Sequence, residues 1–488
     1  MIANQDFPIS EPPLPEPECR SLFLETPPVS PLAEADLEQI HLASMRVLEE
    51  IGMDFLEPRA RKFMADAGAE VDGERVRLPR DLVAKAIATA PERFRMYAQS
   101  GAYCLEFGGN AVNFGSIAST PYCCDLKGGR RPGTMADMSN FVRLLDSLPE
   151  VRLICGYPVE PQDAPPETRH LDAIRAFLTL SDMPCHAYSL GETRIYDALE
   201  MIKRARGIGD AQFAARPSVF SIVNTSSPLR LDKPMAEGLM AMARAGQPVG
   251  VTPFTLSGAM SPITLAGALV QQNAEALAVI ALVQLVNPGA PVLYGGFTSN
   301  VDMRSGSPAF GTPEYARAAL VGGQLARRYK LPYRSSNVNA SNAVDAQAAY
   351  ESMTSLWAAM LAHGNLIMHG AGWLEGGLTS SFEKVVLDAE MYRNLEATLT
   401  PTAYETWRPD PQAIAQLTAA TEALTETSFL PLEEAYEHWR PEPTVERASR
   451  EAQRLIAEHG PRVLDADRLE ALDAFIARRR EEGGAEAA

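Results

Sequence analysis

Short apolar runs bounded by turn residues recur along the middle of the chain. The segments between them carry helix-start signals, for example Ser261-Pro262, Thr312-Pro313 and Asp345. The runs are 30 to 43 residues apart and begin near Val112, Leu153, Cys185, Ser218, Pro248, Pro291, Leu331 and Asn365. Such an interval accommodates one strand and one helix. Eight such units predict an α/β protein, a (β/α)8 TIM barrel, with an open doubly wound sheet as the alternative.

The pattern outside these units divides the rest of the chain. Residues 1–34 have clustered prolines and no period, which predicts an extended arm, and residues 35–100 predict a helical region with a hairpin around Asp72-Gly73. The barrel itself is predicted over 101–395. Residues 396–488 return to charged amphipathic helix, a C-terminal helical extension. Extensions at both ends offer surfaces for a homo-oligomer.

Charge and composition exclude several classes of protein. With 44 Lys and Arg against 62 Asp and Glu, the net charge is −18, which argues against a nucleic-acid or anionic-membrane partner. A hydrophobic share of 46% is sufficient for a large packed core. The most apolar stretch, 276–286, is too short to cross a bilayer, and the N-terminus does not resemble a signal peptide. We therefore expect a cytoplasmic protein.

Several motifs that would assign chemistry are absent from the sequence. The six cysteines include no CxxC, and the seven histidines include no HExxH, so no metal site is predicted. A P-loop, a GxGxxG loop after a strand and a GxSxG nucleophile elbow are also absent. These absences argue against a nucleotide enzyme and a serine hydrolase.

Polar and aromatic residues gather where the predicted strands end, which is where barrel enzymes place their active sites. Trp373 with Glu375 would suit a cationic ligand, and Arg334 and His369 lie at two of the same predicted strand ends. Each also has a structural interpretation, such as packing for Trp373 or a salt bridge for Arg334. The catalytic residue stays unassigned, and the candidate substrate-binding residues are Glu160, Asn224, Phe297, Asn300, Arg334, Asn337, His369, Trp373 and Glu375.

Three long segments carry a family resemblance. They are YGGFTSNVDMRSGSPAFGTPEY (294–315), LPYRSSNVNASNAVDAQAAYESM (331–353) and MHGAGWLEGGLTSSFEKVVLDAEM (368–391). The chain resembles the trimethylamine methyltransferase family, the corrinoid-dependent methylamine methyltransferases. The resemblance implies a TIM barrel that moves a methyl group from an amine to the cobalt of a separate corrinoid protein. This chain would then bind no cofactor of its own, and no histidine follows an aspartate by two residues as the corrinoid-binding DxHxxG motif requires.

The resemblance also bears on the substrate. Archaeal trimethylamine enzymes of this family carry pyrrolysine, and this sequence contains none. It thus resembles the branch without pyrrolysine, some of whose members demethylate glycine betaine and related quaternary amines. A quaternary ammonium already has a neutral amine as its leaving group and needs no acid catalyst. We expect a betaine as methyl donor, and Arg334 or His369 would be a suitable partner for its carboxylate. The alternatives are trimethylamine as donor, a non-catalytic betaine-binding or sensing barrel, and a lyase or isomerase acting on a small polar metabolite.

Overall fold

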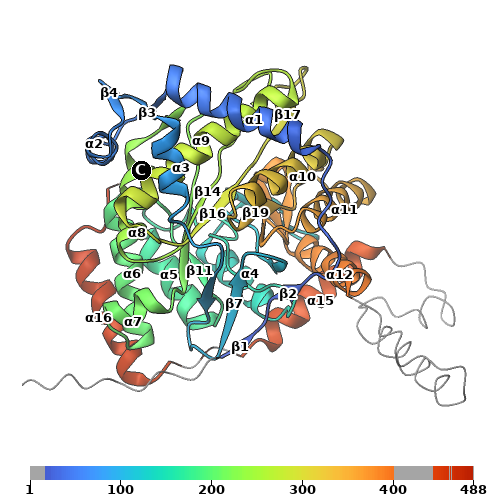
Figure 1. Ribbon diagram of the computed structural model, residues 1–488. Helices are drawn as coiled ribbons and strands as arrows, with labels where there is room; N and C mark the ends of the chain where they lie inside the picture. The colour runs from blue at the N-terminus through green and yellow to red at the C-terminus, as the bar shows by residue number, and fades with distance from the viewer. Residues whose placement is uncertain (1–16, 401–442, 461, 463, 487–488) are drawn as a thin grey trace, which may run out of the picture.

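A curled sheet of eight strands lies at the centre of the molecule, with helices around it (Figure 1). The computed structural model describes residues 17–400, 443–460, 462 and 464–486. All neighbouring strands of this sheet are parallel except β2 and β8, which are antiparallel. In spatial order the strands are β11 (Cys185–His186), β12 (Val219–Val223), β14 (Val249–Val251), β16 (Val292–Gly295), β19 (Tyr333–Ser336), β20 (Leu366–Met368), β8 (Ala111–Phe114) and β2 (Leu22–Phe23).

Seven of the eight predicted apolar runs are confirmed as parallel strands of this sheet. The run that begins at Leu153 makes only single bridges. Leu153 bridges Gly115 just beyond β8, and Ile154 bridges Cys185 in β11, both in the parallel sense. The first and last parallel strands of the sheet, β11 and β8, therefore both lie beside the same short segment. The fold is α/β, with a curled, mainly parallel sheet.

Helices follow the strands and pack on the outside of the sheet. Thr312 and Asp345 cap α10 and α11 as predicted, each accepting a backbone N–H through its side chain. The prediction that Ser261 starts a helix is wrong, because Ser261 bridges Ser257 and Thr264 caps α9 instead. The helices are α4 (Met135–Asp146), α5 (Arg169–Leu180), α6 (Glu192–Arg206), α7 (Asp210–Ala215), α8 (Lys233–Arg244), α9 (Leu265–Val286), α10 (Pro313–Arg328), α11 (Ala346–Leu361) and α12 (Phe382–Leu399).

Helix α9 is mostly apolar, and its few polar side chains, among them Gln271, Asn273 and Glu275, are buried as well. Its 22 residues are long and apolar enough to cross a membrane, but 83% of its most apolar window is buried inside the protein. The helix packs on β14 and β16 and is covered by α1, α3 and α8. A core helix enclosed on every side has no polar face, which accounts for its composition.

The N-terminal region covers one side of this core. Helices α1 (Glu34–Arg46) and α3 (Arg80–Ile87) pack on α9, as Figure 1 shows in blue. The predicted hairpin around Asp72-Gly73 is confirmed. Its strands join a four-stranded sheet made of β3 (Met53–Phe55), β4 (Glu70–Asp72), β5 (Arg75–Arg77) and β13 (Arg230–Leu231). The π-helical turn η1 (Val47–Ile51) and helix α2 (Pro58–Asp66) pack on this sheet.

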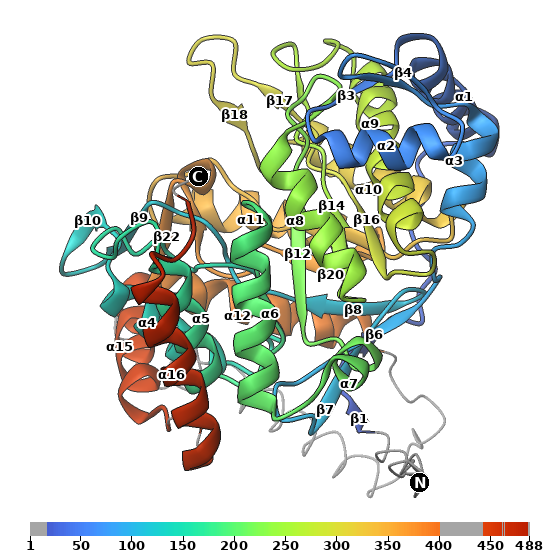
Figure 2. The ribbon, with the colours of Figure 1, turned by 90° about the vertical axis from the view of Figure 1, so that its left-hand side faces the viewer.

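Two C-terminal helices pack on the outer layer. Helix α15 (Thr444–Glu458) lies on α12 and α4, and α16 (Ala466–Glu481) lies on α6, as the red helices of Figure 2 show. The predicted extension 396–488 falls partly outside the described residues, at 401–442, as does the predicted arm at 1–16.

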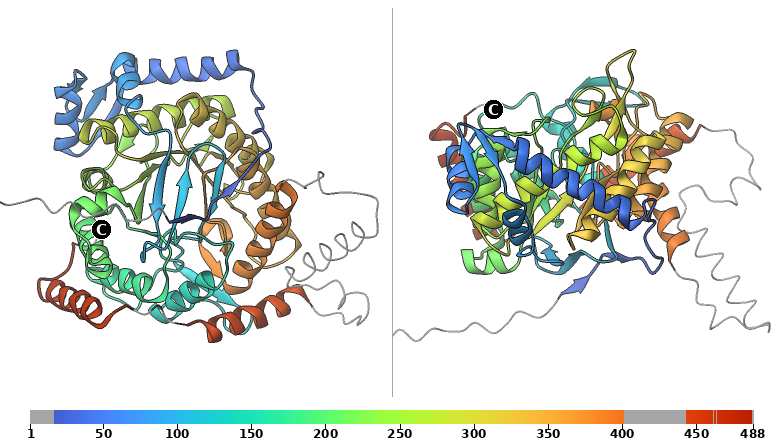
Figure 3. Two further views of the ribbon diagram at one scale, coloured as in Figure 1. Left: turned by 60° about the horizontal axis from the view of Figure 1, so that its bottom comes forward. Right: turned by 45° about the horizontal axis from the view of Figure 1, so that its top comes forward.

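The two ends of the central sheet differ. At the amino ends of its strands, Tyr97 and Gln99 bond to Pro217 and Ser218, so the small sheet of β1 (Glu18–Cys19), β6 (Phe94–Tyr97) and β7 (Tyr103–Phe107) covers that end (Figure 3). Two other small sheets follow the carboxyl ends. They are made of β9 (Tyr122–Asp125), β10 (Gly129–Pro132), β21 (Trp373–Leu374) and β22 (Thr379–Ser381), and of β15 (Leu256–Ser257), β17 (Ser299–Val301) and β18 (Pro308–Ala309).

Candidate active site

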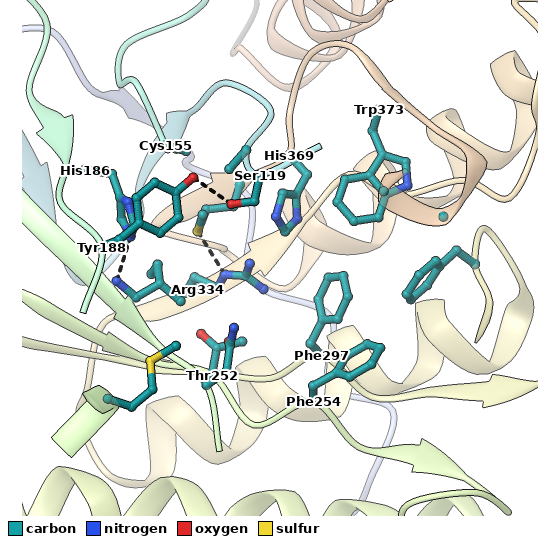
Figure 4. Close-up of a pocket in the computed structure, with 18 residues that line it drawn as sticks. Ser119, Cys155, His186, Tyr188, Thr252, Phe254, Phe297, Arg334, His369 and Trp373 are labelled. Carbon is teal, nitrogen blue, oxygen red and sulfur yellow. Dashed lines mark hydrogen bonds between the residues drawn. The ribbon is translucent and has the colours of Figure 1, made fainter. Parts of the chain in front are cut away.

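A cavity of about 390 Å³ lies at the carboxyl ends of the central strands. Most of its wall is formed by residues that lie in β11, β12, β14, β16, β19 and β20 or just beyond the carboxyl ends of these strands (Figure 4). Parallel strands of an α/β fold bring their carboxyl ends to one edge, so residues far apart in sequence meet there.

Arg334 is the only residue with a permanent positive charge among the described residues that line this cavity. It projects inward from β19, because the preceding Tyr333 points outward and donates its hydroxyl to Ala319 O at 2.8 Å. Figure 4 shows its guanidinium between His369, Phe297 and Thr252. Only 2% of Arg334 is exposed.

The charge of Arg334 has no counter-charge in the described part of the chain. Its Nε donates to Met368 Sδ at 3.3 Å, and its Nη1 has no hydrogen-bond partner. Burial lowers the pKa of Arg334 to about 10, still high enough to keep the guanidinium charged at neutral pH. A buried, unpaired guanidinium is unfavourable unless a ligand supplies the anion.

Four aromatic rings form the adjoining wall, which we call the aromatic group: Phe254, Phe297, Phe310 and Trp373. Phe297 is its hub, with ring centroids 5.3 Å from Phe254, 5.2 Å from Phe310 and 6.2 Å from Trp373. The guanidinium carbon of Arg334 lies 5.3 Å from the Phe297 centroid. An anion-binding group and a set of aromatic faces are therefore direct neighbours.

The remaining titratable groups of the cavity wall are neutral near pH 7. Burial lowers the pKa of His186 to about 3 and holds that of His369 well below its usual value, while Arg334 lowers the latter further. Burial raises the pKa of Cys155 to about 12 and also raises that of Tyr188. The described lining includes no Asp or Glu. The cavity thus offers one positive charge, aromatic surface, and no group that gives up or takes a proton near neutrality.

Backbone strain accompanies two of the lining residues. Ser119 and His369 have φ of 65° and 54°, in the left-handed region that residues other than glycine seldom adopt. Ser119 Oγ lies 2.6 Å from Tyr188 Oη, which accepts the Tyr157 N–H at 2.9 Å. The His369 ring lies 4.4 Å from the Trp373 centroid, and its Nδ1 is 3.2 Å from Ser336 Oγ. Both side chains are held in place by these neighbours.

Five of the nine sequence-predicted site residues line the cavity: Asn224, Phe297, Arg334, His369 and Trp373. The other four lie outside its lining and have partners within the protein. Glu160 pairs with Arg169, and Asn300 accepts from Thr312 at 3.1 Å.

Glu375 and Asn337 belong to the loops around the cavity. Glu375 pairs with Arg130 at 2.9 Å and accepts from Thr379 at 2.8 Å. Asn337 donates to Gly370 O at 2.9 Å. The carboxylate suggested beside Trp373 is thus directed to an arginine instead of the cavity.

Sequence reasoning missed several lining residues, among them Ser119, Tyr188, Thr252, Phe254 and Phe310. Thr252 and Phe254 directly follow β14, and Tyr188 follows β11, so the strand-end rule applied to every unit would have found them. Phe310 comes from the β18 segment and has no such signal. Within the described residues no cluster of three or more His, Cys, Asp or Glu could hold a metal ion, and no disulfide joins the six cysteines.

Comparisons with known proteins identify the family of this chain. The model of the family described as trimethylamine methyltransferase (MTTB) matches residues 10–484. A glycine betaine methyltransferase from Desulfitobacterium hafniense is 37% identical over 361 residues, 74% of this chain and 75% of that protein. A trimethylamine methyltransferase from the same species is 31% identical, covering 75% and 74%. A proline betaine:corrinoid methyltransferase from Eubacterium limosum is 28% identical, covering 74% and 76%. Among solved structures, a dihydropteroate synthase from Coxiella burnetii aligns with a TM-score of 0.36 at 10% identity, over 62% of this chain and 99% of that one.

Proposed function

Because this chain belongs to the trimethylamine methyltransferase family, we propose that it demethylates a betaine, an amine bearing both a quaternary ammonium and a carboxylate. The methyl acceptor would be the cobalt(I) of a corrinoid held by a separate protein, and the reaction would take place in the cytoplasm. The names of two relatives, a glycine betaine and a proline betaine methyltransferase, support this substrate class.

The observation that carries the proposal is the buried, unpaired Arg334. A guanidinium presents a planar fork of N–H donors that matches a carboxylate, and such pairs are strong when shielded from water. Trimethylamine has no carboxylate. Its protonated form would place a second cation beside Arg334 with no Asp or Glu in the described lining to compensate. A betaine brings its own counter-charge.

The aromatic group would hold the other end of the substrate. The negative faces of Phe and Trp rings attract quaternary ammonium, and Phe297, Phe310 and Trp373 lie 5.2 to 6.2 Å apart. Because Arg334 is 5.3 Å from Phe297, the carboxylate and the ammonium must be close together in the substrate. This spacing favours one carbon between them, as in glycine betaine and proline betaine, over the three carbons of γ-butyrobetaine.

The neutral side chains of the wall suit this reaction. When a methyl group leaves a quaternary nitrogen, the nitrogen keeps the electron pair of the broken C–N bond and departs as a neutral amine. No proton is needed, and neither His369 nor His186 carries one to give at neutral pH. The residues of this chain would bind the donor, aim one methyl group at the acceptor and exclude water.

We also infer that the central sheet is a closed (β/α)8 barrel whose second strand is the segment 153–154. The parallel bridges from Leu153 to Gly115 and from Ile154 to Cys185 support this inference. We also propose that the protein forms a homo-oligomer, with the helices that flank the barrel as the subunit interface.

The test is methyl transfer to a reduced corrinoid protein, followed by visible absorbance. The donors are glycine betaine, proline betaine, γ-butyrobetaine and trimethylamine. We expect rapid methylation from the first two and slow or no reaction from trimethylamine. Trimethylamine as the best donor would contradict the role of Arg334. Tight betaine binding without any transfer would favour the sensing barrel.

A further inference from the structure

A buried ion pair lies behind the loop that carries His369 and Trp373. Helix α12 contributes both partners, Lys384 and Asp388, and neither side chain has any exposed surface. The Lys384 ammonium contacts Asp388 Oδ1 and also donates to Ser352 Oγ at 2.8 Å. Removing two charges from water is so unfavourable that a buried pair seldom stabilises a fold more than apolar residues would. Its contacts with the loop suggest another role.

Asp388 is hydrogen-bonded to the backbone of this loop. Its Oδ2 accepts the Gly372 N–H at 2.8 Å. Gly372 has φ of 106°, and a Cβ at this position would lie 2.8 Å from Val385 Cγ2 on α12. A residue larger than glycine would therefore push the loop away from the helix.

Lys384 is linked to the next residue of the loop through two more side chains. Ser352 Oγ accepts from Asn339 Nδ2 at 3.1 Å, and the same Nδ2 donates to Trp373 O at 2.7 Å. The Trp373 indole Nε1 donates to Asn339 O at 3.0 Å. One hydrogen-bonded network thus joins Lys384 and Asp388 to the backbone on both sides of the 372–373 peptide and to the indole ring.

This network restrains a loop that its own sequence leaves flexible. Four of the nine residues in 369–377 are glycine, and glycine adopts a wide range of backbone conformations. Attraction between a cation and a ring depends on the cation lying over the ring face, so the angle of the Trp373 ring matters for binding. We propose that Lys384, Asp388 and Ser352 are positioning residues that fix the Trp373 ring for a quaternary ammonium group. The inference rests on the proposed function for the identity of the ligand, but it does not require methyl transfer.

The experiment uses calorimetry to measure binding of glycine betaine and tetramethylammonium to the full-length protein. Acetate is present with tetramethylammonium, so that Arg334 has an anion. Ser352→Ala removes one hydroxyl and no charge, and we expect the Kd of both ligands to rise about threefold. Lys384→Met/Asp388→Leu removes the acceptor of the Gly372 N–H, and we expect at least a tenfold rise. Lys384→Met/Asp388→Asn retains a carbonyl for that N–H and is expected to recover most of the lost affinity.

Two further measurements separate positioning from general stability. Lys62 and Asp66 form an exposed pair of the same spacing on α2, and Lys62→Met/Asp66→Leu should leave both Kd values unchanged. In a Trp373→Leu background, Ser352→Ala should cause no further loss, because the ring that it positions is gone.

The outcomes are distinct. An unchanged Kd in folded Ser352→Ala would overturn the inference. A loss of affinity caused by Ser352→Ala in the Trp373→Leu background would overturn it as well. If the Lys384→Met/Asp388→Leu variant does not fold, the Ser352→Ala result decides. Failure of the wild-type protein to bind glycine betaine would contradict the proposed function itself.

Discussion

The guanidinium carbon of Arg334 lies 5.3 Å from the ring centroid of Phe297. Arg334 belongs to β19 and Phe297 follows β16 by two residues, and these neighbouring strands pair in parallel at Tyr294–Tyr333 and Gly295–Arg334. One buried cation and one aromatic face thus share a wall of the cavity. This arrangement suits a ligand with a negative group and a positive group close together, and the first two predictions test its two halves.

Replacing Arg334 with methionine should weaken betaine binding and stabilise the protein. The variant loses a shielded, charge-assisted contact with the carboxylate, so the Kd of glycine betaine should rise about 100-fold, and Arg334→Lys should restore only part of the affinity. The same change removes a buried unpaired charge, and we expect the melting temperature of the ligand-free protein to rise. Calorimetry and thermal unfolding measure the two effects. An unchanged Kd together with a lower melting temperature would indicate a purely structural arginine.

Replacing Phe297 with leucine should weaken binding of every quaternary ammonium ligand. Leucine retains apolar contact but has no ring face, so about 1 kcal/mol of cation attraction is lost. The Kd values of glycine betaine and tetramethylammonium should both rise about fivefold. The Arg334→Met variant is the matched comparison, since it should weaken binding of glycine betaine but not of tetramethylammonium, which has no carboxylate. If the Kd values of the two ligands changed equally in each variant, the two charges of the betaine would not have separate binding groups.

Binding should be insensitive to pH across the neutral range. The pKa of His186 is about 3, that of His369 is well below its usual value, and those of Arg334 and Cys155 are about 10 and 12. No group of the wall therefore changes charge between about pH 6 and pH 9. The Kd of glycine betaine should stay constant over this interval and rise as Arg334 loses its proton above it. A change in the Kd of glycine betaine around pH 7 would contradict this and would show that a histidine of the cavity takes up a proton there.

Stability should fall as the pH drops below about 6.5. His186 is neutral when folded, whereas in the unfolded chain it takes up a proton near its usual pKa. The unfolded state then binds more protons, so the free energy of unfolding decreases from about pH 6.5 down to pH 3. His41, His363 and His369, whose pKa values are also lowered by burial, add to the same trend. Urea unfolding at several pH values measures the slope.

A glutamine in place of His186 isolates its share of this effect. The amide oxygen of His186→Gln can still accept the Ile222 N–H, which His186 Nε2 accepts at 3.0 Å. The variant should lose less stability between pH 6.5 and pH 4 than the wild type. An identical slope would assign the acid sensitivity to other groups.

Glu275 should be important for stability, although it lies outside the cavity lining. Its buried carboxylate accepts from Thr225 and from Ser227 Oγ, Leu229 N and Gln271 Nε2 at 2.7, 2.8 and 2.9 Å. Glu275→Gln replaces one acceptor oxygen with a donor that faces other donors. We expect a loss of about 2 kcal/mol in the free energy of unfolding. Urea unfolding of the variant measures it, and a loss below about 0.5 kcal/mol would mean that the loop rearranges freely.

The order of strands and helices followed from the sequence because it is a local property. Each apolar run is bounded by turn residues, and the caps Thr312 and Asp345 act within one helical turn, so both were predicted correctly. Ser261 was misread because its bridge to Ser257 competes with helix capping, and that bridge depends on the path of the chain.

The sequence by itself determined the succession of units, the family and the residue types at the strand ends. It could not tell which strand-end side chains share a cavity, since Glu160, Asn300 and Glu375 satisfy the same rule as Arg334 and His369 yet have partners elsewhere. Only the tertiary structure decided that, because ion pairing and hydrogen bonding across loops depend on distances that the sequence does not specify. The curled sheet brings Arg334 to Phe297 and leaves it without a carboxylate, and that combination is what points to the ligand.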